Sequence, residues 1–166
     1  GYSIAIDAIG NVYTTGQFTG IVDFDPSLGT FNLNSAGARD IFISKLDDSG
    51  NYVWAKSMGG IFSDVGLFVA IDPGGGGIYI TGEFSGTADF DPGPEIFLLS
   101  SNSDECPGYP GSSGCGAAFI SKLDKDSNFV WAKSMFGLNS NAYSWPYSIA
   151  LDASGNVYTT GGFGGT

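Results

Sequence analysis

The fold is decided by a block of 14 residues that occurs twice almost unchanged. Residues 3–16 read SIAIDAIGNVYTTG, and residues 148–161 read SIALDASGNVYTTG. A looser copy, VAIDPGGGGIYITG, occupies residues 69–82. Self-similarity of this kind is the signature of a repeat architecture. The chain is therefore built from one unit that recurs.

Other blocks recur between these copies in the same order. The two DFDP blocks lie 66 residues apart, whereas the two VWAKSM blocks lie 77 apart, which places an insertion of 11 residues between Ser100 and Ala118. The blocks are DFDP at 23–26 and 89–92, FISKLD at 42–47 and 119–124, and VWAKSM at 53–58 and 130–135. We predict three units: residues 1–65, residues 66–145 with a cysteine-containing insertion around 101–117, and residues 146–166 as the first half of a third.

Each complete unit is predicted to form four antiparallel strands. In the first unit, short runs rich in Val, Ile, Phe and Tyr cover residues 3–7, 11–18, 40–47 and 52–58. Two connections are short and place Asp where its carboxylate can cap backbone N–H groups, and Gly or Asn where a positive φ is needed. The third connection, residues 19–39, is long and holds DFDP and an extra strand near Phe31. We still expect the second and third strands to be neighbours.

A single sheet of this sequence would leave apolar side chains on both faces. Ile41, Phe42, Ile43 and Leu46 do not alternate with polar residues, so both faces need cover. We therefore predict an all-β fold of tandem four-stranded antiparallel blade-like repeats, a partial β-propeller, with a linear stack of β-sheets as the alternative. A ring of at least four such blades needs about 260 residues. We expect a longer parent chain, or several copies, to complete the packing.

The repeated blocks resemble a known family. The sequences IAID, GNVYTTG, FISKLD and VWAKSM look like the bacterial β-propeller repeat labelled SBBP, with the DFDP spacer of some surface-protein versions, and the strand order is similar to that of NHL-type blades. The resemblance covers the chain except for the insertion. It implies a secreted or cell-surface bacterial protein, and it transfers no catalytic residues because the family shares none.

Charge and cysteine content limit the partners and the location. The net charge of -11 repels nucleic acid and anionic lipid surfaces, and no stretch is long and apolar enough to span a bilayer, so we expect neither nucleic acid binding nor membrane insertion. Cys106 and Cys115 share one loop rich in Gly, Pro and Ser, where we predict a disulfide. A disulfide favours an extracellular or cell-surface location; a pair of free cytosolic thiols is the alternative.

The chain contains no histidine, which excludes Ser-His-Asp and Cys-His catalysis and His-based zinc sites. The glycine run 74–77 is followed by no Lys-Ser/Thr and is interpreted as a turn. A hydrolase or lyase would need acid and base carboxylates in one unit that the other lacks, and the repeated blocks contain no such pair. We predict that the chain is not an enzyme.

Paired aspartates are the candidate metal ligands. Asp23 and Asp25, and again Asp89 and Asp91, are spaced so that both carboxylates of a pair project to one face of an extended segment. Such oxygen ligands suit calcium. Because the pair recurs with the unit, the alternatives are a structural turn or ion pair, and, less favoured, a glycosidase carboxylate pair.

Repeated aromatic and basic residues are assigned to the scaffold. Trp54 and Trp131 occupy matched positions and are predicted to lie between blades, although each could stack on a sugar. The lysines of the repeated blocks are expected to pair with aspartates or lie at sheet edges. Tyr143 and Trp145 fall in a less regular connection and are the better candidates for an exposed contact surface.

Two functions fit these observations. The first is a noncatalytic extracellular repeat scaffold, a surface, adhesive or fibre-forming protein whose partners are further repeats or copies of itself. The second is a calcium-dependent module of a larger secreted enzyme that binds carbohydrate or surface proteins.

Overall fold

The computed structural model describes residues 1–101, 116–136 and 143–164. Within these ranges every regular element is a β-strand, so the all-β prediction is confirmed. No helix in the described part of the chain is long and apolar enough to cross a membrane.

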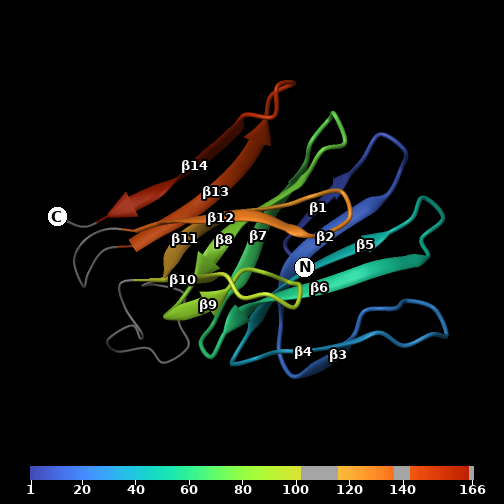
Figure 1. The fold of residues 1–166 in the computed structure, drawn as a ribbon, viewed down its shortest axis with the longest axis horizontal. Coiled ribbons are helices and arrows are strands. Elements are labelled where there is room, and N and C mark those ends of the chain that lie inside the picture. Colours follow the sequence, from blue (N-terminus) through green and yellow to red (C-terminus); the bar gives the residue numbers. More distant parts are fainter. Residues whose placement is uncertain (102–115, 137–142, 165–166) are drawn as a thin grey trace.

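The described strands form antiparallel sheets of six, four, two and two strands, within which the repeated blocks lie on two groups of four strands and one group of two (Figure 1). We call them blade 1, blade 2 and the half-blade. Blade 1 contains β1 (Ser3–Ile6), β2 (Val12–Phe18), β5 (Asp40–Leu46) and β6 (Tyr52–Gly60). Blade 2 contains β7 (Val65–Ile71), β8 (Ile78–Phe84), β11 (Ala117–Leu123) and β12 (Phe129–Met135). The half-blade contains β13 (Tyr143–Leu151) and β14 (Val157–Gly164).

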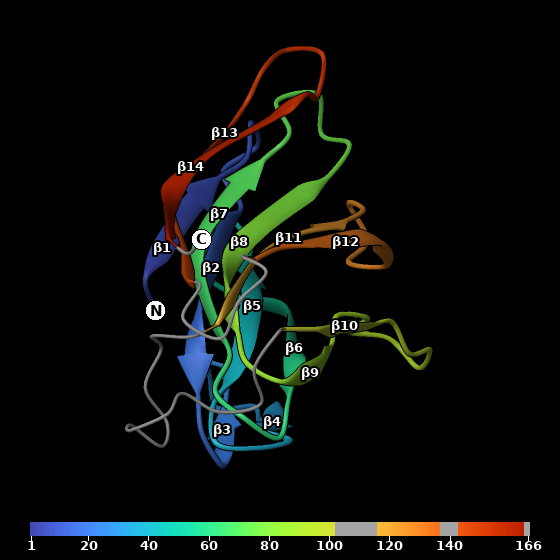
Figure 2. The ribbon, with the colours of Figure 1, turned by 90° about the vertical axis from the view of Figure 1, so that its left-hand side faces the viewer.

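The long connection inside each blade folds as a separate hairpin. In blade 1 it forms β3 (Ile21–Asp23) and β4 (Asn32–Asn34), and in blade 2 it forms β9 (Thr87–Asp89) and β10 (Leu98–Ser100). The second and third strands of each blade remain neighbours, since β2 pairs with β5 and β8 pairs with β11. Figure 2 shows β1, β7 and β13, the first strand of each unit, beside one another, with both hairpins in the lower half of the view.

Blade 1 and blade 2 pack face to face through one apolar core. Ile41 and Ile43 of blade 1, and Ile80 of blade 2, have no exposed surface and belong to a single buried cluster. Each such side chain contributes about 1.5–3 kcal/mol when it is buried. The backbone N–H of Val69 also donates to Ser3 Oγ across the boundary at 3.2 Å. Stacking of neighbouring sheets thus covers one face of blade 1.

The other face of blade 1 is covered in part by its own hairpin, whereas the hairpin of the second unit packs on the face of blade 2 that meets blade 1. The Phe of each DFDP block carries this packing: the Phe24 ring lies 4.9 Å from that of Phe42, and the Phe90 ring lies 4.8 Å from that of Phe119. β5 does not alternate between apolar and polar residues because both of its faces are covered. Ile41 faces blade 2, and Phe42 lies under the β3–β4 hairpin.

The glycine that ends the repeated 14-residue block is required by a close approach between strands. A Cβ on Gly82 would lie 1.9 Å from the Val65 carbonyl oxygen, and one on Gly161 would lie 2.4 Å from the Trp145 carbonyl oxygen. Both sites adjoin irregularities in the pairing of the first strand of the unit, at Gly66/Phe68 and at Pro146/Ser148. Any other residue would force this strand away from its partner.

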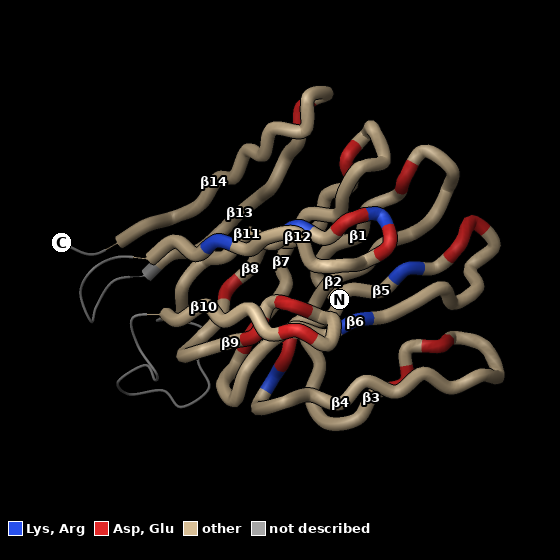
Figure 3. Tube along the Cα trace, viewed as in Figure 1, with Lys and Arg blue, Asp and Glu red and all other residues tan. Residues whose placement is uncertain are grey.

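Aspartates fix the short turns between strands. Asp47 Oδ1 accepts hydrogen bonds from the backbone N–H groups of Ser49 at 2.9 Å and Asn51 at 2.8 Å, and its Oδ2 accepts from Asn51 Nδ2 at 2.9 Å. The side-chain bond from Asn51 is the main reason that the pKa of Asp47 is lowered. Figure 3 shows other acidic residues at the tips of equivalent turns. Many of the acidic residues therefore stabilise the turns that reverse the direction of the chain.

Candidate binding surfaces

The aspartates predicted to bind calcium lie in the two inserted hairpins, where they cap the loop. Asp23 Oδ1 accepts hydrogen bonds from the backbone N–H of Phe31 at 2.8 Å and from that of Asp25 at 3.0 Å. These two bonds lower the pKa of Asp23. Asp25 Oδ1 in turn accepts from the backbone N–H of Ser27 at 2.8 Å.

The second pair repeats this geometry. Asp89 Oδ1 accepts from the backbone N–H groups of Phe97 at 2.9 Å and Asp91 at 3.0 Å, and Asp91 Oδ1 accepts from Gly93 at 2.7 Å. Across the described residues, no group of three or more His, Cys, Asp or Glu side chains is placed to hold a metal ion. One oxygen of each carboxylate accepts backbone hydrogen bonds within the loop. Calcium binding at these sites stays a prediction.

The β9–β10 hairpin links two blades through backbone pairing. β9 pairs with the end of β6 of blade 1, with Gly59 opposite Asp89 and Gly60 opposite Ala88. This addition makes β9 and β10 part of the sheet of blade 1, although they belong to the second unit. The equivalent strand β3 pairs with β4 alone among the described residues, so its second edge has no strand beside it. The outer edge of β3 is therefore open to pairing with another strand, as β9 pairs with β6.

The repeated tryptophans have matching surroundings in the two blades. Trp54 packs edge-on against Tyr13 at 6.2 Å between ring centroids, and Trp131 packs in the same way against Tyr79 at 6.2 Å. Two of the repeated lysines, which we expected to pair with aspartates or lie at sheet edges, lie over these tyrosine rings. Lys45 Nζ is 5.1 Å from the Tyr13 centroid and Lys122 Nζ is 4.9 Å from the Tyr79 centroid.

The outer face of blade 1 exposes apolar side chains whose counterparts in blade 2 are covered. Ile4 and Ile6 on β1 are 65% and 64% exposed, whereas Val69, at the position of Ile4 in blade 2, is 7% exposed. The half-blade shows the same contrast, because Tyr158 is 58% exposed and the equivalent Tyr13 is 4% exposed. Both ends of the stack thus present surfaces that are buried inside it.

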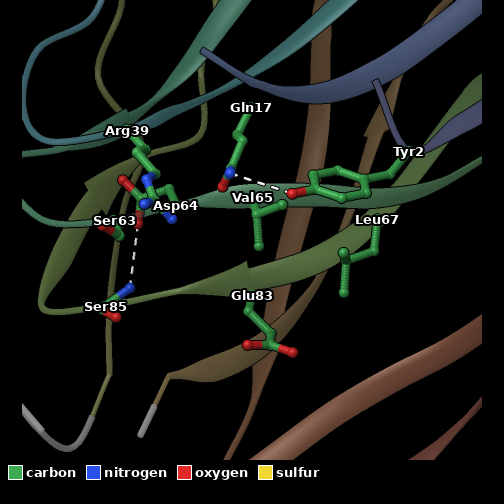
Figure 4. A pocket seen from close by; sticks show the side chains of 9 residues that line it. All are labelled: Tyr2, Gln17, Arg39, Ser63, Asp64, Val65, Leu67, Glu83 and Ser85. Atoms are coloured by element: carbon green, nitrogen blue, oxygen red, sulfur yellow. Dashed lines mark hydrogen bonds between the residues drawn. The ribbon is translucent and has the colours of Figure 1, made fainter. Parts of the chain in front are cut away.

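A cavity of about 160 Å³ lies where blade 1 meets blade 2 (Figure 4). Tyr2 and Gln17 line it from blade 1, Val65 and Glu83 from blade 2, and Arg39 and Asp64 from the segments that precede β5 and β7. Figure 4 shows Arg39 and Asp64 together on one side of Val65, with Glu83 on another.

The two acids of this cavity, Asp64 and Glu83, differ in their hydrogen bonding. Asp64 is fully buried, and its carboxylate accepts from the backbone N–H of Gly60 at 2.7 Å and of Ser85 at 3.1 Å. Burial raises the pKa of Asp64 to about 7. Glu83 is 7% exposed, its Oε2 has no hydrogen-bond partner among the described residues, and burial raises its pKa to about 7. Asp64 therefore links the ends of β6 and β8 through its two hydrogen bonds. Glu83, in contrast, buries one carboxylate oxygen without a hydrogen-bond partner among the described residues.

Glu83 and Asp64 each stand at a position where another unit has no acid. The position of Glu83, directly after the glycine that ends the repeated block, is Gln17 in the first unit and Gly162 in the third. The position of Asp64, eight residues before the turn aspartate, is Ser144 in the next unit. The prediction compared only the blocks that match, and these acids lie just outside them. A position-by-position comparison of units would have found both.

Several predicted features lie outside the described residues. These are Cys106 and Cys115, with their predicted disulfide, and most of the insertion around 101–117. For Tyr143 only the backbone is described. Trp145, the other candidate for an exposed contact, is 39% exposed.

Comparison with known proteins supports the repeat architecture. The chain is 23% identical to a WD repeat-containing protein of Acanthamoeba polyphaga mimivirus, in an alignment that covers 99% of this chain and 12% of that relative. No family model matches the chain. The distant WD repeat relative and the stacked antiparallel sheets together fit a β-propeller-type repeat, and they suggest a noncatalytic repeat scaffold.

Proposed function

We propose that the chain is a noncatalytic extracellular scaffold, a surface, adhesive or fibre-forming protein of the bacterial SBBP type, whose blades pack against further repeats or copies of itself. The observation that carries this proposal is the contrast between Ile4, which is 65% exposed, and Val69 at the same position of blade 2, which is 7% exposed. We infer from this contrast that the Ile4 face of blade 1 is covered in the assembled protein, as the Val69 face is covered at the boundary between blade 1 and blade 2.

The two ends of the stack are complementary. The internal boundary joins the Tyr13 face of blade 1 to the Val69 face of blade 2. The half-blade presents its Tyr158 face, blade 1 presents its Ile4 face, and these are the two halves of the same interface. The edge of β3 would pair with the fourth strand of a further repeat, as β9 pairs with β6 through Gly59 and Asp89. Head-to-tail contacts of this kind generate rings if the rotation closes and filaments if it does not.

Charge substitution on the Ile4 face tests this proposal. In sedimentation velocity the chain should form larger species as its concentration rises, and the double variant Ile4→Lys, Ile6→Lys should stay monomeric because two ammonium groups cannot be buried in the interface. The control Ile96→Lys changes a residue that is 73% exposed in the loop of the β9–β10 hairpin, and it should associate like wild type. A wild-type chain that remains monomeric at every concentration would overturn the proposal that copies complete the packing.

The other function class is a calcium-dependent module of a larger secreted enzyme that binds carbohydrate or surface proteins. It is supported by the alignment with only 12% of a longer relative, which fits a part of a larger chain. A glycan array probed with and without a chelator tests it. Chelator-sensitive hits would support it, and an array without hits would count against carbohydrate recognition.

A further inference from the structure

The outer edge of β14 in the half-blade has no strand beside it (Figure 1). Among the described residues, β14 pairs with β13 alone. The equivalent strands of the complete blades pair on both sides, because β5 lies beside β2 and β11 lies beside β8. An open edge presents unpaired backbone N–H and C=O groups and is a template for another strand.

The tyrosine of the repeated block is covered in both complete blades and uncovered in the half-blade. In blade 1 and in blade 2 its ring lies under a lysine of the third strand and beside a tryptophan of the fourth. These tyrosines, Tyr13 and Tyr79, are 4% and 1% exposed. Tyr158 is the same residue of the third unit and is 58% exposed. Within the described residues, no lysine lies over its ring and no tryptophan packs against it.

A threonine of β14 lacks the acceptor that it has in the other units. Thr15 Oγ1 donates to the Phe42 carbonyl oxygen of β5 at 2.7 Å, and Thr81 Oγ1 donates to the Phe119 carbonyl oxygen of β11 at 2.6 Å. Thr160 stands at the same position, is exposed, and makes no such bond within the described part of the chain. Because this bond runs to the third strand of the same blade, a strand at the edge of β14 is what satisfies it.

We propose that the outer edge of β14 binds a two-stranded β-hairpin with the sequence pattern of the third and fourth strands of this repeat, supplied by a further repeat unit. A lysine of its first strand lies opposite Tyr158, as Lys45 lies opposite Tyr13. The carbonyl oxygen three residues before that lysine accepts from Thr160, as that of Phe42 accepts in blade 1. Strand addition gains affinity from backbone hydrogen bonds and specificity from alternate side chains. The inference rests on the proposed scaffold function, because it takes a repeat unit as the partner.

A synthetic peptide of residues 116–136, which contains the third and fourth strands of blade 2, tests the proposal. The fluorescence anisotropy of the labelled peptide is followed as the chain is added, with a scrambled peptide of the same composition as the blank. We expect saturable binding at one site, weakened about tenfold or more in Tyr158→Ala, which loses the ring contacts. Thr160→Val keeps the shape but loses one hydrogen bond and should weaken binding about two- to tenfold. The control Ile96→Ala, in the β9–β10 loop, should bind like wild type.

The double variant Ile4→Lys, Ile6→Lys separates this inference from the scaffold proposal. Its substitutions lie at the other end of the stack, so it should bind the peptide like wild type while it stays monomeric. Peptide binding by a wild-type chain that never self-associates would uphold the edge site and overturn the packing of copies, and self-association without peptide binding would do the reverse. Equal binding of the scrambled peptide, or undiminished binding by Tyr158→Ala and Thr160→Val variants whose circular dichroism matches wild type, would also overturn the edge site.

Discussion

The backbone of Gly59 pairs with that of Asp89 across the boundary between two repeat units. Asp89 thus has two tasks, because its carboxylate also accepts the backbone N–H groups of Asp91 and Phe97. The β9–β10 hairpin is thus stabilised within its own loop by this carboxylate and is paired with the fourth strand of the preceding blade. The second DFDP block, at residues 89–92, therefore joins two blades as well as turning the chain.

Replacement of the Asp89 carboxylate tests its role as a loop cap. Asp89→Ala leaves two backbone N–H groups without their acceptor and should lower the free energy of unfolding by about 1–2 kcal/mol. Asp89→Asn keeps one oxygen that can accept both bonds and should cost less than half as much. Urea denaturation followed by circular dichroism measures both variants. Equal losses for Ala and Asn would show that charge, not the accepting oxygen, matters here.

The two DFDP phenylalanines should differ in their contribution to stability. Phe90 is fully buried, and Phe90→Ala should cost about 3–5 kcal/mol through lost burial and the cavity left behind. Phe24 is half-buried because no blade covers its hairpin from outside, so Phe24→Ala should cost markedly less. Urea denaturation of each variant alone provides the comparison. If Phe24→Ala proved as costly as Phe90→Ala, the two hairpins would have to be equally covered in solution.

The strands were predictable because their signals are local and repeated. The boundaries expected at 11–18 and 40–47 fall within one residue of β2 and β5, since the turns between strands carry Asp, Gly and Asn at fixed positions. Lack of alternation at Ile41 and Phe42 likewise predicted cover on both faces. These properties depend on residues that are close in sequence.

The cavity and the pairing between blades were not predictable in this way. β9 joins β6 through Gly59 and Gly60, which carry no side chain and hence no sequence pattern. The cavity brings together Tyr2, Arg39 and Glu83, which are distant in sequence and lie outside the matching blocks. Repetition marks what the fold needs, whereas single positions such as Glu83, where the units differ, carry no repeated signal.

Calcium addition and removal test the predicted metal sites. If the Asp23 and Asp89 hairpins bind calcium, millimolar calcium should raise the melting temperature relative to a chelator, because a ligand that binds only the folded state stabilises it. The double variant Asp25→Asn, Asp91→Asn should lose this shift while keeping an oxygen for the turn bonds. Magnesium at the same concentration is the control for ionic strength. Identical melting curves in calcium and in chelator would remove calcium from these sites.

Stability should decline as the pH rises from about 4 to about 7. Burial raises the pKa values of Asp64 and Glu83 to about 7, so over this range the folded chain keeps protons that the unfolded chain has released. The cost is absent below the unfolded pKa values and complete above the folded ones. Asp47 acts in the opposite sense: its pKa is lowered, and its contribution is lost only at lower pH, as the carboxylate becomes protonated.

Glu83→Gln isolates one of these two acids, because it keeps the shape of the side chain and removes its charge. The variant should be more stable than wild type at pH 8, by up to about 3 kcal/mol, and the two should converge near pH 4. Urea midpoints measured at intervals between pH 4 and pH 8 give the two curves, with Glu95→Gln expected to follow wild type. Parallel curves for Glu83→Gln and wild type would mean that Glu83 ionises without cost, and that the cavity is open to water in the folded protein.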